Sequence, residues 1–292
     1  MEFNMNFQQV VSVGNMRKSD ANAIANHTTS AQLMHRAAKG IYNAVKFTGK
    51  VAIVCGKGNN GGDGYALACI LCQNGITPTI FRISDSFSKD GLYYYKTAIS
   101  LGAAEESISA AGSFTGYDIV VDCLLGTGFS GEIKGELLSA IEQINSSNAY
   151  IISADINSGI NGDTGVADIA VNSDLTVSIG SFKTGLFLND APYYIESAVN
   201  ADIGIELLEE EYKLIDYSLL HMFEGYNSCV MTTEEFFSRY KYTPDNCNIA
   251  ECIAKLSTDE RRTIVVKTEH SAVIADLKYI YFCADYVTLN TF

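Results

Sequence analysis

The stretch with the most reactive side chains is the glycine-rich loop Asn59-Asn60-Gly61-Gly62-Asp63-Gly64. Two amides and a carboxylate stand among glycines, which cost backbone entropy unless the loop geometry requires them. The apolar run Val51–Cys55 precedes the loop, and a helix-like apolar run follows from Tyr65. A strand, a glycine loop and a helix together predict a site where backbone N–H groups meet a bound anion. A plain turn is the simpler alternative.

The glycine spacing by itself does not identify the ligand. No Lys-Ser or Lys-Thr pair closes the loop, so it is not a Walker A motif. A GxGxxG spacing exists at Gly56, Gly58 and Gly61, but a glycine-rich loop meets that pattern easily. The specific feature is therefore the set of polar side chains from Asn59 to Asp63.

Two further polar loops follow predicted strands. Asp122 ends the run Asp118–Asp122 before the loop Gly126–Gly131, and Asp155 ends the run Tyr150–Asp155. Asp122 is either a turn carboxylate or a ligand, because burying it unpaired would be costly. Asp155 is either an acid/base group or a hydrogen-bond partner for a sugar hydroxyl. Because loops at the carboxyl ends of parallel strands share one edge, we expect one composite site.

Oxygen ligands and one lysine extend the candidate site. Asn60, Asp122 and Ser158 come from three strand ends and offer only oxygen atoms, which favours a hard cation over a transition metal. Lys183 could meet a phosphate or be a solvated loop lysine, and the sequence slightly favours the solvated reading. The four histidines form no ligand or triad spacing.

Short apolar runs alternate with helical patterns along most of the chain. The patterns predict two helices between Met16 and Val45, the first capped by Ser19 or Asp20 and the second preceded by Thr29 and Ser30. This alternation predicts an α/β fold with a mostly parallel sheet covered on both faces. The remaining predicted strands are 77–83, 175–179 and 197–203, and the remaining helices are 62–73, 88–101 and 136–144.

Composition restricts the class of protein. The 292 residues carry a net charge of −14, which argues against a broad surface for nucleic acid or anionic membrane. No apolar run approaches the roughly 20 residues of a membrane span, and no secretory signal is apparent. The eight cysteines are scattered, which indicates reduced thiols and a cytoplasmic protein. Cys69 and Cys72 form a CxxC that we interpret as helix packing.

The pattern changes after about residue 205. The acidic segment that follows reads as a linker or a docking helix, and residues 264–267, 270–276 and 278–282 predict strands around a tight turn. We therefore expect one domain over residues 1–210 and a small C-terminal α/β extension over residues 211–292.

Four motifs, taken together, carry a family resemblance. They read Val54–Gly64, Val121–Gly131, Asp155–Gly159 and Ser181–Leu186, in that order. This region resembles the NAD(P)H-hydrate epimerase family, the YjeF N-terminal domain. The resemblance implies a Rossmann-like three-layer α/β/α sandwich that is often a homodimer.

The resemblance also implies an activity and a site. Such enzymes interconvert the R and S epimers of NADHX and NADPHX, the hydrated forms of reduced nicotinamide cofactors. It implies a potassium ion on Asn60, Asp122 and Ser158, and we take Asp155 as the catalytic acid/base. The implied substrate-binding residues are Asn59, Asn60, Gly61, Gly62, Asp63, Gly126, Thr127, Gly128, Phe129, Ser130, Gly131, Glu132 and Asp155.

The chain departs from the family pattern at several positions. Asn157 replaces a proline, Ser181-Phe182 replace Ala-Pro, and Met34–Gly40 lacks a Glu and an Asn of the usual segment. The extension faintly resembles a dehydratase but lacks its nucleotide-binding loop, so we expect an inactive remnant. The rival reading is a non-catalytic nucleotide-binding or dimerising scaffold of the same fold. A kinase-like enzyme would need a phosphate-clamping loop that this chain lacks.

Overall fold

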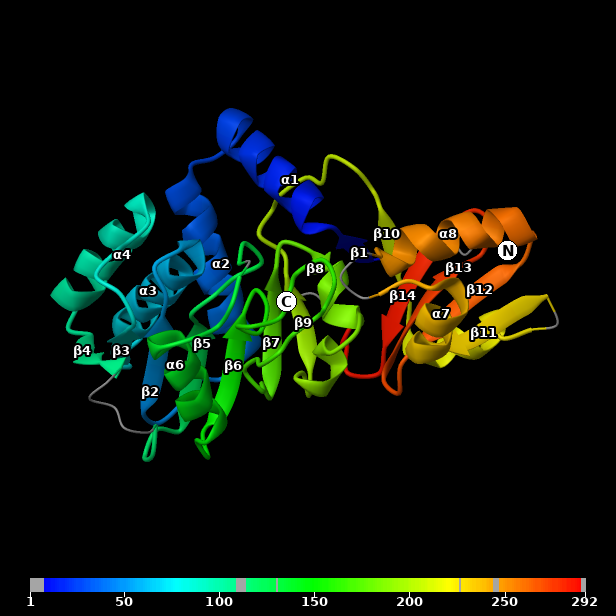
Figure 1. Ribbon diagram of the computed structural model, residues 1–292. Coiled ribbons are helices and arrows are strands. Elements are labelled where there is room, and N and C mark those ends of the chain that lie inside the picture. Colours follow the sequence, from blue (N-terminus) through cyan, green and yellow to red (C-terminus); the bar gives the residue numbers. More distant parts are fainter. Residues whose placement is uncertain (1–7, 109–113, 130, 226, 244–246, 290–292) are drawn as a thin grey trace.

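The main sheet positions all three polar loops. The computed structural model describes residues 8–108, 114–129, 131–225, 227–243 and 247–289, and they form two seven-stranded sheets (Figure 1). The strands of the main sheet are all parallel. Their order is β4 (Ala104–Ser107), β3 (Thr79–Arg82), β2 (Val51–Cys55), β5 (Ile119–Cys123), β6 (Tyr150–Ala154), β7 (Leu175–Ile179) and β9 (Ala198–Ala201).

Helices cover both faces of the main sheet. Every residue of β2, β5 and β7 is buried, as expected for a parallel sheet between two helical layers. On one face lie α2 (Ser30–Ala44), α3 (Asn59–Gln73) and α4 (Lys89–Ser100), and on the other lies α6 (Glu136–Asn145). The predicted three-layer α/β/α sandwich is confirmed.

Local sequence accounts for most of the helix ends. Thr29 and Gln32 form a capping box at the start of α2, and Ser88 caps α4. The helix predicted to start at Gly62 begins at Asn59 instead, so Asn59 and Asn60 belong to its first turn. The predicted strands 77–83, 175–179 and 197–203 are confirmed as β3, β7 and β9.

The first helix differs from the prediction. Helix α1 (Val13–Asn26) starts earlier than expected and is capped by Ser12, so neither Ser19 nor Asp20 is its N-cap. Ser12 donates both its N–H and its hydroxyl to Glu211, at 2.5 and 2.9 Å, and the N–H of Val13 donates to Asp163 at 2.7 Å. The start of α1 depends on these distant carboxylates, which local pattern does not reveal.

A second, mixed sheet gathers segments from three parts of the chain (Figure 1). The strands predicted at 264–267, 270–276 and 278–282 are confirmed as β12, β13 and β14, whereas β1, β8, β10 and β11 were not predicted. The strand order is β11 (Ser228–Thr232), β12 (Thr263–Lys267), β13 (Ser271–Ala275), β14 (Ile280–Ala284), β10 (Tyr212–Leu214), β1 (Gln8–Val11) and β8 (Phe182–Lys183).

Helices pack on both faces of this second sheet. On one face lie α7 (Thr233–Tyr240) and α8 (Ile249–Glu260), and on the other lies the 3₁₀ helix η3 (Tyr217–Phe223). The segment after residue 205 is therefore neither a free linker nor a docking α-helix, because it supplies β10 and η3. Two shorter 3₁₀ helices, η1 (Thr184–Phe187) and η2 (Ala191–Tyr193), follow β8. The domain boundary after residue 210 stays a prediction.

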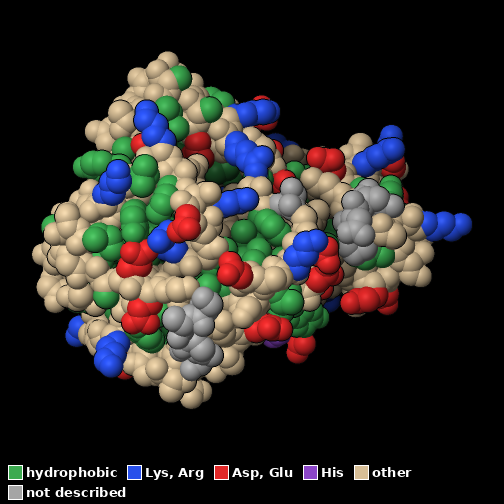
Figure 2. All heavy atoms as spheres, turned by 60° about the vertical axis from the view of Figure 1, so that its left-hand side comes forward, with side chains coloured by type: hydrophobic (Ala, Val, Ile, Leu, Met, Phe, Trp, Pro, Cys, Tyr) green, Lys and Arg blue, Asp and Glu red, His purple; other side chains and the backbone are tan. Residues whose placement is uncertain are grey.

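The surface mixes charges of both signs. On the face shown in Figure 2, acidic and basic side chains are interspersed and hydrophobic side chains lie exposed between them. Among the described residues, no helix is both long enough and apolar enough to cross a bilayer.

Candidate active site

A large cleft lies at the carboxyl ends of β2, β5 and β6. Its volume is about 1030 Å³, and its wall includes α1 and the starts of α2 and α3. The loops after β2 and β5 and the end of β6 meet here, as the sequence predicts. Of the predicted substrate-binding residues, the cleft is lined by Asn59, Asn60, Asp63, Gly126, Thr127, Gly128, Phe129 and Asp155.

An ion pair between a buried lysine and a half-buried aspartate lies in this cleft. The Lys183 ammonium donates to the Asp155 carboxylate at 2.5 Å and to the Ile179 carbonyl at 2.6 Å. Lys183 is only 1% exposed, so the solvated reading of this lysine is wrong. A charged amine is that deeply buried only when it is paired and hydrogen-bonded.

Backbone geometry fixes the carboxylate of this pair. Asp155 follows β6 directly and has a φ of +69°, a left-handed conformation that aspartate tolerates better than most residues. Its N–H donates to the Val177 carbonyl at 2.8 Å, and its second carboxylate oxygen accepts from the N–H of Thr127 at 3.4 Å. The carboxylate therefore points across the cleft toward the loop after β5.

Two more carboxyl groups, those of Asp20 and Asp63, interact electrostatically with Lys183 and Asp155. Burial raises the pKa of Asp20 to about 6, where Lys183 opposes the rise and Asp155 adds to it. Burial also raises the pKa of Asp63 well above its usual value, and Asp155 and Asp20 add to that rise. The cleft thus holds the Lys183 ammonium near carboxyl groups whose pKa values are raised above the usual range.

A polar cluster lies beneath the cleft. The Asp122 carboxylate is fully buried and accepts from the N–H of Ser158 at 2.9 Å, the Ser158 hydroxyl at 2.6 Å and the Ser153 hydroxyl at 3.0 Å. The Asn60 amide N–H donates to the Leu125 carbonyl at 2.7 Å, while its buried Oδ1 has no hydrogen-bond partner among the described residues. The structure therefore brings Asn60, Asp122 and Ser158 together between three strand ends.

Four of the predicted residues do not line the cleft. A Cβ on Gly61 would lie 2.0 Å from the Gly56 carbonyl, and one on Gly62 would lie 2.4 Å from the Met34 side chain, so both glycines serve packing. Gly131 and Glu132 are exposed, and Glu132 pairs with Lys134 at 3.3 Å. Ser130 lies outside the described residues.

The cleft also contains charged residues that the sequence analysis did not select. Asp20 and Arg17 reach it from α1, and Lys57 and Lys134 reach it from the loops after β2 and β5. Arg17 and Asp20 are three residues apart, which places them on the same face of α1. The sequence does not reveal that this face lies against the loops of the cleft.

Comparison with known proteins assigns the chain that forms this cleft to a family. The model of the family described as YjeF-related protein N-terminus matches residues 30–185, which is more than half of the chain. This chain belongs to the YjeF-related N-terminal family. The matched range contains the three loops and Lys183, while α1 lies before it and the C-terminal extension lies after it.

Relatives of this YjeF-related domain include enzymes of two lengths. The NAD(P)H-hydrate epimerase of Limosilactobacillus fermentum is 30% identical over 201 residues, which cover 67% of this chain and 97% of the relative. The bifunctional NAD(P)H-hydrate repair enzyme Nnr of Methanothermobacter thermautotrophicus is 37% identical over 208 residues. That match covers 65% of this chain but only 39% of the relative.

A solved structure supports the fold. The yeast protein ynu0 superposes with a TM-score of 0.58 at 19% sequence identity, over 69% of this chain and 96% of the yeast chain. At this level of identity the likeness bears on the YjeF-related fold alone.

Proposed function

We propose that this protein epimerises the R and S forms of NADHX and NADPHX. The observation that carries the proposal is the ion pair between buried Lys183 and Asp155, which faces the polar loops of a cleft of about 1030 Å³. A cleft of that size accommodates a dinucleotide. The printed names of the relatives in Limosilactobacillus fermentum and Oenococcus oeni, both NAD(P)H-hydrate epimerase, support the same activity.

The charges around the cleft suit a dinucleotide phosphate. The N-terminus of α3 is Asn59, and its cap residue Gly58 supplies no side-chain hydrogen bond, so N–H groups at this end are available to an anion. Arg17 and Lys57 line the same cleft. We propose that these groups hold the diphosphate while the hydrated ring lies near Asp155.

Epimerisation inverts the carbon that carries the hydroxyl and adjoins the ring nitrogen. The nitrogen lone pair expels the hydroxyl, which leaves as water after it gains one proton, and a water molecule then adds to the opposite face and loses one proton. Asp155 passes the first proton, supplied by Lys183, to the leaving oxygen and takes the second proton back. Lys183 is reprotonated through the same carboxylate, so the pair ends the cycle unchanged.

The cluster beneath the cleft fits a potassium ion. Asn60 Oδ1, which has no partner in the described part of the chain, is a buried acceptor that a cation would satisfy, and Asp122 supplies negative charge. The Ser158 hydroxyl accepts from the N–H of Leu125 at 2.8 Å and keeps a second lone pair for a ligand. Bound there, potassium would supply positive charge where the three loops meet. We propose it as the cofactor, while homodimerisation and a cytoplasmic location stay predictions.

The activity is tested by following the R to S ratio of purified NADHX and NADPHX by chromatography. We expect the protein to accelerate equilibration and Asp155→Asn to slow it by about 10²-fold or more, as loss of an acid/base group does. If Asp155→Asn stayed within a few-fold of the parent, Asp155 would only bind substrate. A parent protein without any acceleration would favour the non-catalytic scaffold.

The cofactor is tested by thermal unfolding in potassium and in sodium buffers of equal ionic strength. We expect potassium to raise the melting temperature of the parent by roughly 2 °C or more, because a ligand bound only to the folded state stabilises it. Asn60→Ala should abolish the difference. Asn59→Ala, which changes the exposed neighbouring amide, should keep it, and equal melting in both salts for the parent would remove potassium from the proposal.

A further inference from the structure

The segment that carries Lys183 is held mainly by residues far from it in sequence. Lys183 ends β8, and the 3₁₀ helix η1 follows at Thr184–Phe187. Strand β8 has only two residues and pairs in parallel with β1, where Val11 lies opposite Lys183. Such a short strand has little stability of its own. Its position must therefore come from its neighbours.

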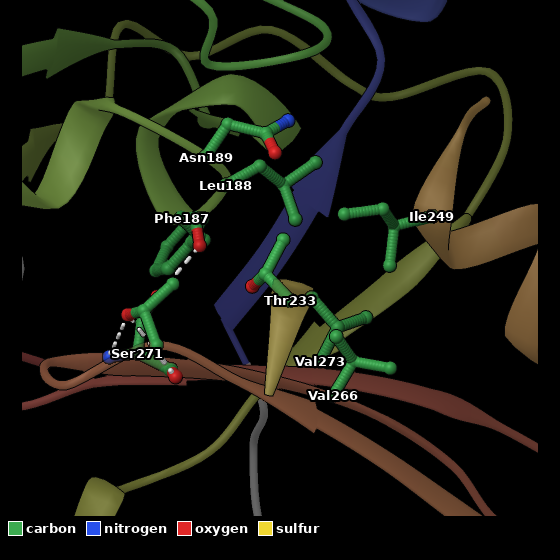
Figure 3. Close-up of a pocket in the computed structure, with 9 residues that line it drawn as sticks. Phe187, Leu188, Asn189, Thr233, Ile249, Val266, Ser271 and Val273 are labelled. Atoms are coloured by element: carbon green, nitrogen blue, oxygen red, sulfur yellow. Dashed lines mark hydrogen bonds between the residues drawn. The ribbon is translucent and has the colours of Figure 1, made fainter. Parts of the chain in front are cut away.

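The C-terminal extension, residues 211–292, supplies two buried hydrogen bonds to this segment. The Tyr286 hydroxyl donates to the Leu186 carbonyl at 2.6 Å, and the Ser271 hydroxyl donates to the Phe187 carbonyl at 2.7 Å. Figure 3 shows Ser271 reaching the backbone of Phe187. Both residues line a small cavity, whose volume is about 10 Å³. These carbonyls belong to the third and fourth residues after Lys183, and they are buried away from water.

Strand pairing joins the extension to the same segment. Strand β14 pairs with β10, β10 pairs with β1, and β1 pairs with β8, so one hydrogen-bonded sheet runs from the extension to Lys183. The ring of Phe187 also packs against that of Phe282, with centroids 5.4 Å apart. The Tyr286 carbonyl accepts from the N–H of Ala198, at 2.8 Å, on the edge strand of the main sheet.

We propose that the C-terminal extension is a positioning element of the active site, in which the Tyr286 and Ser271 hydroxyls hold the β8–η1 segment so that the Lys183 ammonium stays against Asp155. This inference rests on the proposed function, because it assigns Lys183 a place in that reaction. Tyr286 and Ser271 do not line the cleft, so we assign them a positioning role. The matched range of the family ends at residue 185, so this support lies outside the family pattern.

Tyr286→Phe is the first test, because it removes one hydroxyl and leaves the ring in place. We expect kcat for epimerisation to fall by about 10-fold while KM changes by less than about twofold, since the displaced group acts on the reacting atoms and not on the bound phosphates. Ser271→Ala should act in the same direction. Tyr240→Phe is the matched control, because that hydroxyl donates to Glu260 at 3.2 Å, within the extension and away from Lys183.

A second readout does not depend on activity. We expect acylation of Lys183 by an activated ester, followed by mass spectrometry, to be at least about threefold faster in Tyr286→Phe than in Tyr240→Phe, because local opening exposes the amine. Lys134, which is exposed, serves as the internal reference. Ile253→Val removes one methyl group from the core at α8 and controls for a general loss of stability. It should alter neither kcat nor the labelling of Lys183.

Support requires both effects together. If kcat fell without faster labelling of Lys183, or labelling rose without loss of kcat, or Ile253→Val reproduced both changes, the positioning role would be overturned. If the parent protein failed to epimerise either hydrate, the proposed function would fail, and the labelling comparison alone would decide whether the extension holds Lys183.

Discussion

Asp20 lies in the middle of α1, and its carboxyl group interacts electrostatically with Lys183 and Asp155 in the cleft. Burial raises its pKa from 3.8 to about 6, so ionisation is less favourable in the folded than in the unfolded state. Such a group reduces stability progressively as pH rises above 3.8, and the full cost is present above about pH 6. Below pH 3.8 both states are protonated and the cost disappears.

Asp20→Asn should therefore stabilise the protein in a pH-dependent way. Above pH 6 we expect a gain of about 1–2 kcal/mol, after allowing for the partial exposure of the side chain, and the gain should shrink as pH falls toward 4. Thermal melts of parent and variant across this range measure it. Asp259→Asn, at an exposed position on α8, is the control. A gain that did not vary with pH would contradict this account.

The sequence could predict a site residue where that residue lies at or near the end of an apolar run. Asp155 directly follows the buried end of β6, and Asp122 lies one residue before the end of β5, so the apolar runs that precede both carboxylates are readable without a structure. Lys183 and Asp20 were not predictable, because their burial depends on β1 and α1, whose neighbours are about 170 to 200 residues away in sequence. A lysine in a polar loop and an aspartate on an exposed-looking helix carry no local sign of such surroundings.

At the scale of elements, the loop between β2 and α3 depends on a close approach of two backbones. A Cβ on Gly56 would lie 1.8 Å from the Leu124 carbonyl oxygen, so the loops after β2 and β5 touch only because this residue has no side chain. The N–H of Gly56 also donates to the Cys123 carbonyl at 3.0 Å. This contact brings Asn60 to the loop that carries Gly126 and Thr127.

Gly56→Ala should separate these loops. We expect a loss of about 1–3 kcal/mol or more, because neither backbone can move away cheaply, together with loss of epimerisation. Gly58→Ala is the matched control in the same loop, since a Cβ there meets nothing within 4 Å, and it should change stability by less than about 1 kcal/mol. Melting temperature and the R to S assay measure both variants, and equal behaviour of the two would refute this reading.

Most strands of the main sheet could be predicted because strands buried on both faces are continuous apolar runs, such as VAIVC and LTVSI. The missed strands are of another kind. Strand β4 reads AEES and is exposed along its whole length, and β8 and β10 have two and three residues. Their pairing comes from tertiary contact, because so few residues leave no period to detect.

At the scale of the whole molecule, the two sheets share chain segments and contacts. Strands β1 and β8 come from the N-terminal two-thirds of the chain but lie in the sheet of the C-terminal extension. The N–H of Thr288 also donates to the Ala198 carbonyl, at 2.9 Å, on the edge of the main sheet. The predicted small extension is thus part of a larger, non-local sheet, which sequence periodicity cannot reveal.

Shared strands should couple the unfolding of the two sheets. We expect differential scanning calorimetry of the full chain to show a single transition, with equal calorimetric and van't Hoff enthalpies. The reason is that unfolding the extension would leave one edge of β1 and the Leu186 and Phe187 carbonyls without their hydrogen-bond partners. Two resolved transitions would show that the extension unfolds independently.

Strand β1 also has a consequence for synthesis of the chain. Residues Gln8–Val11 are made before their partners in β8 and β10, which follow about 170 and 200 residues later. At translation rates of about 5–20 residues per second, both edges of this strand stay open for roughly 10 seconds or longer. An unpaired strand is a site of misassembly during that interval. Lys183 reaches its native surroundings only after the extension has been made, so the main sheet can form before the Lys183–Asp155 pair is in place.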